Sequence, residues 1–141
     1  DASFGSAGFA PIRVRPEDVP GIGPRLSSAA AIAVQPDGRI IIVGTYVTER
    51  FNRNPSDAVV ARLKDDGALD ESFGIGGIAQ FGFDDGIDLS RDVANAVALD
   101  AEARPVFVGA SYSSASQSRS YAVARLQQLP DLLFHDSFES P

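Results

Sequence analysis

The sequence contains no cysteine, methionine or tryptophan, and it has a single histidine. Without cysteine the chain can form neither disulfide bonds nor thiolate metal sites. No apolar run is long enough to span a bilayer. The chain begins at Asp1 rather than at a methionine, which fits removal of a signal peptide. We therefore expect an exported protein, extracellular or at the cell surface, that gains its stability from packing, bound ions or assembly.

Basic residues are also scarce. Twelve lysines and arginines stand against 19 aspartates and glutamates, so the net charge is −7 and the pI is near 4.5. Nucleic-acid binding needs a basic patch to neutralise phosphates, and this composition argues against it. Apolar residues make up 44% of the 141 residues and charged residues 22%, which is typical of one globular domain.

A duplication organises the chain. The motif Asp-x-Ser-Phe-Gly occurs at Asp1–Gly5 and at Asp70–Gly74, and a longer pattern follows each copy. The matched segments are Gly8 with Gly77, Ala31–Val34 with Ala96–Leu99, Ile42–Gly44 with Phe107–Gly109, and Ala58–Leu63 with Tyr121–Leu126. Repeats of this period are typical of solenoids and propellers. We divide the chain into repeat 1 (residues 1–69), repeat 2 (residues 70–133) and a tail (residues 134–141).

Each repeat predicts four β strands, because short apolar runs alternate with Gly, Pro, Asp and Ser clusters. The predicted pairs are Gly8–Val14 with Gly77–Phe83, Ala29–Gln35 with Ala94–Asp100, Arg39–Tyr46 with Pro105–Tyr112, and Asp57–Leu63 with Ser120–Leu126. The run Ile40–Val43 has no polar alternation, which indicates a strand covered on both faces. The expected fold class is all-β: two tandem four-stranded antiparallel sheets that resemble propeller blades.

The turn between the second and third strands differs between the repeats. In repeat 1 it is Pro36-Asp37-Gly38, which supplies a fixed φ, a turn-forming carboxylate and a glycine for positive φ. In repeat 2 it is Ala101-Glu102-Ala103. We expect that repeat 2 has lost its turn specification and that packing sets its register.

These motifs resemble the delta-60 repeat family of bacterial exported proteins. The resemblance rests on Leu69–Gly77, on Val34–Arg39, on the apolar strand Ile40–Gly44 and on Ala61–Leu63, and it covers the chain to about Leu126. It implies a propeller-like fold and brings no established catalytic residues. The chain departs from the family pattern in the lost Pro-Asp-Gly of repeat 2 and in its small number of repeats.

Two repeats are too few to close a propeller, which needs about four to eight blades. Repeat units bury their faces by stacking on neighbours, so we expect the missing neighbours to be other copies of this chain, in a ring or a filament. The alternative is a monomer whose two sheets close onto each other. The tail Phe134–Glu139 partly echoes Leu69–Gly74 and is a possible docking segment.

Residues with catalytic or metal-binding chemistry are few. A Ser-His-Asp triad would have to use His135 in the tail, and no nucleophile elbow or phosphate loop is present. Asp84, Asp85 and Asp88, with Asp92 nearby, could offer calcium its oxygen ligands around Gly86, although their spacing is not that of a known calcium loop. The pair Asp65-Asp66 is a weaker candidate. We assign no catalytic residue, cofactor or metal ligand.

Some residues recur at equivalent positions. Asp1 and Asp70, Arg62 and Arg125, and Phe4 and Phe73 could line a ligand groove, but a structural role is the simpler interpretation. In that role each aspartate caps a turn or pairs with a repeat arginine, and each phenylalanine fills the core. The tyrosines could form a sugar-binding surface; they are Tyr46, Tyr112 and Tyr121.

The sequence thus predicts a non-enzymatic structural or adhesive protein that assembles with copies of itself. The alternative is a carbohydrate- or ligand-binding module built from two-blade protomers, with a cell-surface glycan as a possible partner. A hydrolase is a third, weaker alternative. No nucleic-acid partner and no membrane span are expected.

Overall fold

The computed structural model describes residues 1–14, 26–47, 56–83, 90–113 and 117–127. All regular elements in these ranges are β strands. They are β1 (Leu26–Val34), β2 (Ile40–Val47), β3 (Ser56–Leu63), β4 (Ile78–Phe81), β5 (Arg91–Leu99), β6 (Pro105–Ser113) and β7 (Ser118–Arg125).

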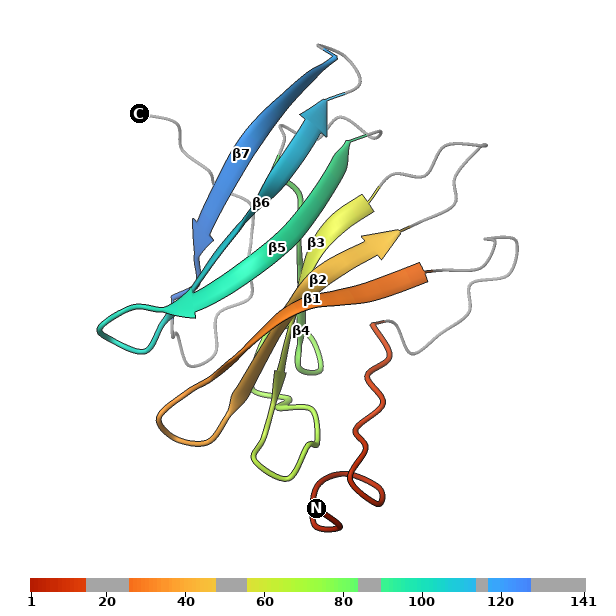
Figure 1. Cartoon of the computed structure of the whole chain (residues 1–141), viewed down its shortest axis with the longest axis vertical. Helices are drawn as coiled ribbons and strands as arrows, with labels where there is room; N and C mark the ends of the chain where they lie inside the picture. Colours follow the sequence, from red (N-terminus) through yellow and green to blue (C-terminus); the bar gives the residue numbers. More distant parts are fainter. Residues whose placement is uncertain (15–25, 48–55, 84–89, 114–116, 128–141) are drawn as a thin grey trace.

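The strands form one open sheet in the order β1-β2-β3-β5-β6-β7, with β4 also paired to β3 (Figure 1). Strands β1 to β4 make an antiparallel unit, which we call blade 1, and β5 to β7 make a second unit, blade 2. A single parallel pair, Ser56 with Arg91, joins the two. The protein is therefore an all-β, propeller-like fold whose sheet does not close, as the sequence predicted.

Strand β4 crosses from one repeat to the other. It lies in the sequence of repeat 2, yet it pairs with β3 of repeat 1 through Ala58–Ala61 and completes blade 1. Its counterpart in repeat 1, the predicted strand Gly8–Val14, is not a strand, and the one bridge there is Ser6 with Phe9. This prediction was wrong: the segment pairs with no strand of the sheet in the described residues, and an extended segment needs such a partner for its backbone groups to form a strand.

Both blades carry the same irregularity. A β-bulge interrupts β1 between Ala29 and Ala31 and interrupts β5 between Ala94 and Ala96. The strand opposite has a glycine at this point in each blade. A Cβ on Gly44 would lie 1.9 Å from the Ser28 carbonyl oxygen, and one on Gly109 would lie 1.8 Å from that of Val93. The bulge therefore requires glycine, and it twists both blades at the same place.

The turn of repeat 2 keeps the geometry of the turn in repeat 1, contrary to our expectation. The Gly38 N–H donates to the Gln35 carbonyl at 2.9 Å, and the Ala103 N–H donates to the Asp100 carbonyl at the same distance. Asp100 fixes the second turn because its Oδ1 accepts the N–H groups of Glu102 and Arg104 at 3.0 and 2.9 Å. Ala103 has φ of 59°, where Gly38 has 86°. A carboxylate thus replaces the missing Pro-Asp-Gly signal.

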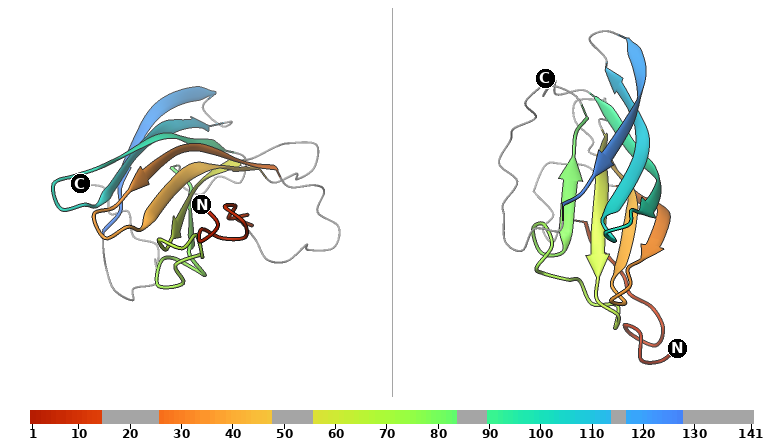
Figure 2. Two further views of the ribbon diagram at one scale, coloured as in Figure 1. Left: turned by 60° about the horizontal axis from the view of Figure 1, so that its bottom comes forward. Right: turned by 90° about the vertical axis from the view of Figure 1, so that its left-hand side faces the viewer.

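The core has two parts. The larger lies between the blades and contains the fully buried Ile41, Val43 and Val60 of blade 1 together with Phe107 of blade 2. The smaller lies on the opposite side of blade 1, where Tyr46, Val59, Ala61 and Ile78 meet the N-terminal segment. Figure 2 shows this segment (red) beside the loop between β3 and β4. Blade 1 is therefore fully covered on one side and partly covered on the other, so the cover on both faces that the unbroken run Ile40–Val43 predicted is only partly present.

Candidate functional site

Each blade has two faces, which we name by the direction of the chain. The downstream face of blade 1 contains Ile41, Val43, Ala58 and Val60, and it packs on blade 2. The upstream face of blade 2, with Ala94, Phe107 and Leu126, receives it. Phe107 also meets Phe81 and Phe83 of blade 1 at ring-centroid distances of 5.5 and 6.0 Å. This contact shows how one blade packs on the next within the chain.

The downstream face of blade 2 has no partner among the described residues. The residues that correspond to Val43, Ala58 and Val60 are Val108, Tyr121 and Val123, which share one face of the β6–β7 pair. The three blade 1 residues are fully buried, whereas Val108, Tyr121 and Val123 are 42%, 98% and 67% exposed. The same position in the repeat is therefore core in one blade and apolar surface in the other.

The upstream face of blade 1 is only partly covered. Ile12 and Val14 of the N-terminal segment pack against its outer part. Toward β1, Ile32 and Val34 are each 61% exposed. Their counterparts in blade 2 are Val97 and Leu99, and Val97 packs against the core between the blades. The molecule thus exposes the downstream face of blade 2 and part of the upstream face of blade 1. A downstream and an upstream face are also the two surfaces that pack together between its own blades.

A buried carboxylate fixes the end of blade 1. Asp70 is 4% exposed, and its Oδ2 accepts hydrogen bonds from Arg39 Nε and Arg62 Nε, each at 2.8 Å. Its Oδ1 accepts the Ser72 Oγ–H at 2.7 Å and the Ser72 N–H at 3.2 Å. The Arg62 guanidinium also lies 4.8 Å from the centre of the Phe73 ring. Asp70 therefore both caps its own turn and ties that turn to β3 and to the residue that precedes β2.

The environment of Asp70 favours its charged form. Burial raises the pKa of Asp70, but the hydrogen bonds from Ser72, the positive charge of Arg62 and the hydrogen bond from Arg39 outweigh burial and hold this pKa below its usual value. Asp70 thus remains a carboxylate with satisfied partners. Of the predicted roles for the recurring residues, the structural one is the role that Asp70, Arg62 and Phe73 take in this geometry.

The N-terminal motif has the same conformation as the Asp70 motif but lacks its arginine contacts. Gly5 and Gly74 have φ of 57° and 54°, and Gly8 and Gly77 have 88° and 89°. The Ser3 Oγ–H donates to Asp1 Oδ1 at 2.7 Å, as Ser72 does to Asp70. No arginine pairs with Asp1 in the part of the chain that the structure describes. The motif is instead held by the Gly5 N–H, which donates to the Asp66 carbonyl at 2.7 Å.

Blade 2 has arginines at the two positions that bind Asp70 in blade 1. Arg104 and Arg125 occupy the positions of Arg39 and Arg62. Arg104 Nε donates to Asp100 Oδ2 at 2.7 Å, and Arg125 lies 3.9 Å from the same oxygen with a side chain that is 57% exposed. Arg104 also pairs with Glu102 Oε2 at 2.9 Å, so it already engages two carboxylates, as Arg39 engages Asp37 and Asp70. Arg125 makes only the longer contact with Asp100, and its exposed guanidinium is the one that a further carboxylate could reach.

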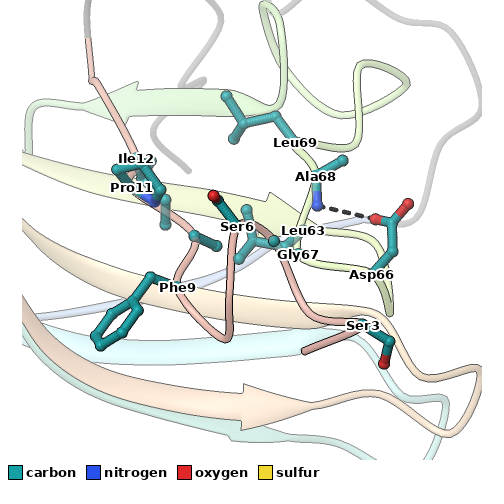
Figure 3. A pocket seen from close by; sticks show the side chains of 12 residues that line it. Ser3, Ser6, Phe9, Pro11, Ile12, Leu63, Asp66, Gly67, Ala68 and Leu69 are labelled. Atoms are coloured by element: carbon teal, nitrogen blue, oxygen red, sulfur yellow. Dashed lines mark hydrogen bonds between the residues drawn. The ribbon is translucent and has the colours of Figure 1, made fainter. Parts of the chain in front are cut away.

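A shallow hollow lies beside the N-terminal motif (Figure 3). It has a volume of about 390 Å³ and runs between Ser3–Ile12 and the Leu63–Leu69 loop. The Ser3 and Ser6 hydroxyls, the Asp66 carboxylate and the Phe9 ring are its chemically distinct groups. Asp66 Oδ1 is engaged by the Ala68 N–H at 2.9 Å, and the Phe9 ring points away from Leu69 in Figure 3. The size falls within the range of small-ligand sites.

Several sequence candidates lie elsewhere. Asp84, Asp85 and Asp88, like His135, fall outside the described residues. Asp92 is fully buried, and its Oδ2 accepts the Phe83 N–H at 3.0 Å. No group of three or more metal-ligating side chains gathers within the described ranges.

The tyrosines do not form one surface. Tyr46 is buried in the smaller core, so the three tyrosines do not share the sugar-binding surface that the sequence left open. Tyr121 is open, and Tyr112 meets Arg119 with the guanidinium 5.9 Å from the ring centre. No helix of sufficient length and apolarity to cross a membrane was found in the described part of the chain.

Comparison with known proteins agrees with the propeller-like architecture. Residues 35–73 match a family model described as a domain of unknown function (DUF5122) beta-propeller. The match runs from the first turn through β2 and β3 to the Asp70 motif. No curated protein and no solved structure matches the chain significantly. The chain is thus similar to a propeller-like repeat family over this segment.

Sequence reasoning missed two features of this site. Arg39 and Arg104 both directly follow the turn that precedes their strand, and comparing the two repeats at that position would have identified them. Sequence reasoning also did not distinguish the two apolar faces of a blade. Their separation depends on the strand register, which the three-dimensional pairing supplies.

Proposed function

We propose that this protein is a non-enzymatic structural protein, extracellular or at the cell surface, whose β repeats stack with those of other copies. The observation that supports this most is the pair of exposed faces. Val108, Tyr121 and Val123 on blade 2 correspond to residues that are buried in blade 1, and Ile32 on blade 1 corresponds to Val97 in the core. Apolar patches of this kind are typical of interaction surfaces.

We take the contact between the two blades as the template for the proposed assembly. A downstream face meets an upstream face, so the interface is heterologous, and copies that repeat it form a ring if the rotation closes and a filament if it does not. A ring of about four to eight blades would be a closed propeller, assembled from two, three or four copies. The finer resemblance to the delta-60 family of exported proteins supports the proposed location.

The test is the size of the purified chain. Size-exclusion chromatography with light scattering, together with negative-stain microscopy, should show particles larger than one chain. Changing Ile32 and Val34 to glutamate should return the protein to single chains, because charges would enter the apolar interface. Ile75→Glu is the matched control, since Ile75 is 83% exposed but lies in a turn outside both faces. A wild-type chain that stays single at high concentration would overturn the proposal.

A carbohydrate- or ligand-binding module is the second candidate, favoured by the hollow beside Ser3 and Ser6. Hydroxyls, one carboxylate and one aromatic ring are groups that could hold a sugar there. A glycan array probed with the wild-type chain and with a Phe9→Ala variant tests it. Binding that falls in the variant would support this candidate, and the absence of any bound glycan at high protein concentration would count against it.

A further inference from the structure

We propose that Phe9–Ile12 of one copy adds as a fourth strand to the free edge of β7 in a second copy, with Asp1 engaging Arg125 there. The inference rests on the proposed self-assembly and specifies which segment joins the chains. It accounts for a missing strand. Blade 1 has four strands, whereas blade 2 has three in the described residues, and β7 pairs only with β6.

Blade 1 provides the template for this strand. There β4 pairs antiparallel with β3, with Ala61 opposite Ile78 and Ala58 opposite Phe81. Transferring this register through the repeat places Phe9 opposite Ala124 and Ile12 opposite Tyr121. The turn before each segment already has one conformation: the Gly77 N–H donates to the Phe73 carbonyl, and the Gly8 N–H donates to that of Phe4, both at 2.9 Å.

The segment already lies where the proposal needs it. Phe81 and Phe83, at the end of blade 1, contact the upstream face of blade 2 through Phe107. Ile12 and Val14 are their counterparts and contact the upstream face of blade 1 in the same way. The N-terminal segment thus occupies the place of the outer strand of a preceding blade, and a second copy's β7 can join it without displacing it.

Two side chains of the segment fit an outer strand. Phe9 is 76% exposed, whereas its counterpart Ile78 is 9% exposed in the smaller core. Pro11 corresponds to Gln80. The Arg62 N–H donates to the Gly77 carbonyl, so by alternation along the ladder the pair of Val59 and Gln80 is not hydrogen-bonded. The N–H at this position points away from β3, where proline is tolerated on an edge strand.

The charged groups are complementary as well. Asp70 pairs with Arg39 and Arg62 at the end of blade 1. Asp1 has the turn but no arginine in the described residues, and blade 2 has Arg125 with an exposed side chain. A second copy is the occupant that these features favour, because one chain carries both the unpaired motif and the unfilled position, and the faces beside them match the intrachain interface.

The experiment uses the absence of cysteine from the chain. A Phe9→Cys chain is mixed with an Ala124→Cys chain under mild oxidation. In the antiparallel register these residues form a non-hydrogen-bonded pair with Cα atoms about 4.5 Å apart, a separation that a disulfide spans. We expect a covalent dimer that contains one chain of each kind. Pairing Phe9→Cys with Tyr121→Cys is the control, because these positions lie three residues out of register, about 10 Å apart.

The outcomes separate this inference from the proposed function. Assembly by light scattering without a preferred disulfide between the Phe9→Cys and Ala124→Cys chains would overturn the strand addition and leave self-assembly in place. A chain that stays single would overturn both. A cross-link that forms only after residues 133–141 are deleted would show that the chain's own tail fills the β7 edge, and would also overturn it. Asp1→Lys should weaken assembly at least about tenfold, and Arg125→Glu in the mixed partner should restore part of it.

Discussion

Ala103 is a residue in a conformation that suits glycine better. It has φ of 59° at the end of the turn in repeat 2, where repeat 1 has Gly38. The left-handed region costs a residue with a Cβ about 1 kcal/mol. We expect Ala103→Gly to raise the free energy of unfolding by about 0.5–1 kcal/mol and Gly38→Ala to lower it by about 1 kcal/mol. Urea denaturation followed by circular dichroism measures both, and equal midpoints for the two variants would contradict the strain.

Asp70 should contribute to stability far more than Asp1. Asp70→Asn leaves the Arg39 and Arg62 guanidinium groups without their carboxylate, so we expect the free energy of unfolding to fall by about 2 kcal/mol. Asp1→Asn is the matched control, since Asp1 is exposed and caps a turn of the same shape. In dilute protein it should cost less than about 0.5 kcal/mol. Similar losses in the two variants would show that the arginines add nothing.

The pKa of Asp70 also predicts a pH dependence. Because this pKa is lower in the folded protein than in the unfolded chain, the stabilisation is fully present above the unfolded pKa of about 3.9 and is lost as the pH falls through the folded value. The wild type should therefore lose more stability on acidification than Asp70→Asn does. Unfolding midpoints measured from pH 6 downward test this, and parallel curves would be the contrary result.

For single residues, the sequence predicted part of the site. The recurrence of Asp70 with Arg62 correctly indicated a pairing, because both residues stand at fixed positions in the repeat. It could not show that Asp1 lacks the same partner. That difference depends on the surroundings of each motif: the Asp70 motif lies beside Arg39 and Arg62, whereas the Asp1 motif lies against the Asp66 carbonyl.

Among the strands, the shared bulge is the feature most sensitive to substitution. A Cβ at Gly44 or Gly109 would overlap a carbonyl oxygen of the facing strand. We expect Gly44→Ala and Gly109→Ala each to lower the free energy of unfolding by about 2–3 kcal/mol. Gly76→Ala is the control, since nothing lies within 4 Å of a Cβ placed there and Ala7 stands at the matching position. Its positive φ alone should cost about 1 kcal/mol. Chemical denaturation should give Gly76→Ala a clearly higher free energy of unfolding than the other two variants. Equal losses in the three variants would show that the bulge tolerates a side chain.

The sequence predicted most strands but not all of their partners. Seven of the expected elements formed near their predicted bounds, because composition and turn residues specify strands locally. Pairing is not local. Residues 77–83 and 8–14 carry the same pattern, yet only the first finds an edge, that of β3, because β3 precedes it in the chain.

For the whole molecule, the two unlike faces predict a mixing experiment. Changing Ile32 and Val34 to glutamate blocks the upstream face, and changing Tyr121 and Val123 to glutamate blocks the downstream face. Each variant alone should stay single, whereas an equal mixture should form one-to-one dimers, because each retains one intact face. Light scattering of the mixture tests this. A mixture that stays single while the wild type assembles would indicate a symmetric interface and contradict head-to-tail stacking.

The overall architecture was predictable as far as the count of repeats allowed. The duplicated motif indicated blades, and their number indicated an incomplete propeller. Which surfaces remain open could not be predicted, because Val43 and Val108 look alike in sequence. They differ in their surroundings, since Val43 packs on blade 2 and Val108 has no blade packed on it among the described residues.

The crossing of β4 between the repeats has a consequence for how such a chain can evolve by gene duplication. The segment that the sequence repeats, residues 1–69, is not the segment that folds as a blade, since blade 1 ends with Ile78–Phe81 of the following repeat. A tandem duplication of one repeat would therefore not append a separate module. It would insert a blade whose last strand is supplied by the next repeat, so the chain could gain or lose copies while every internal blade kept four strands.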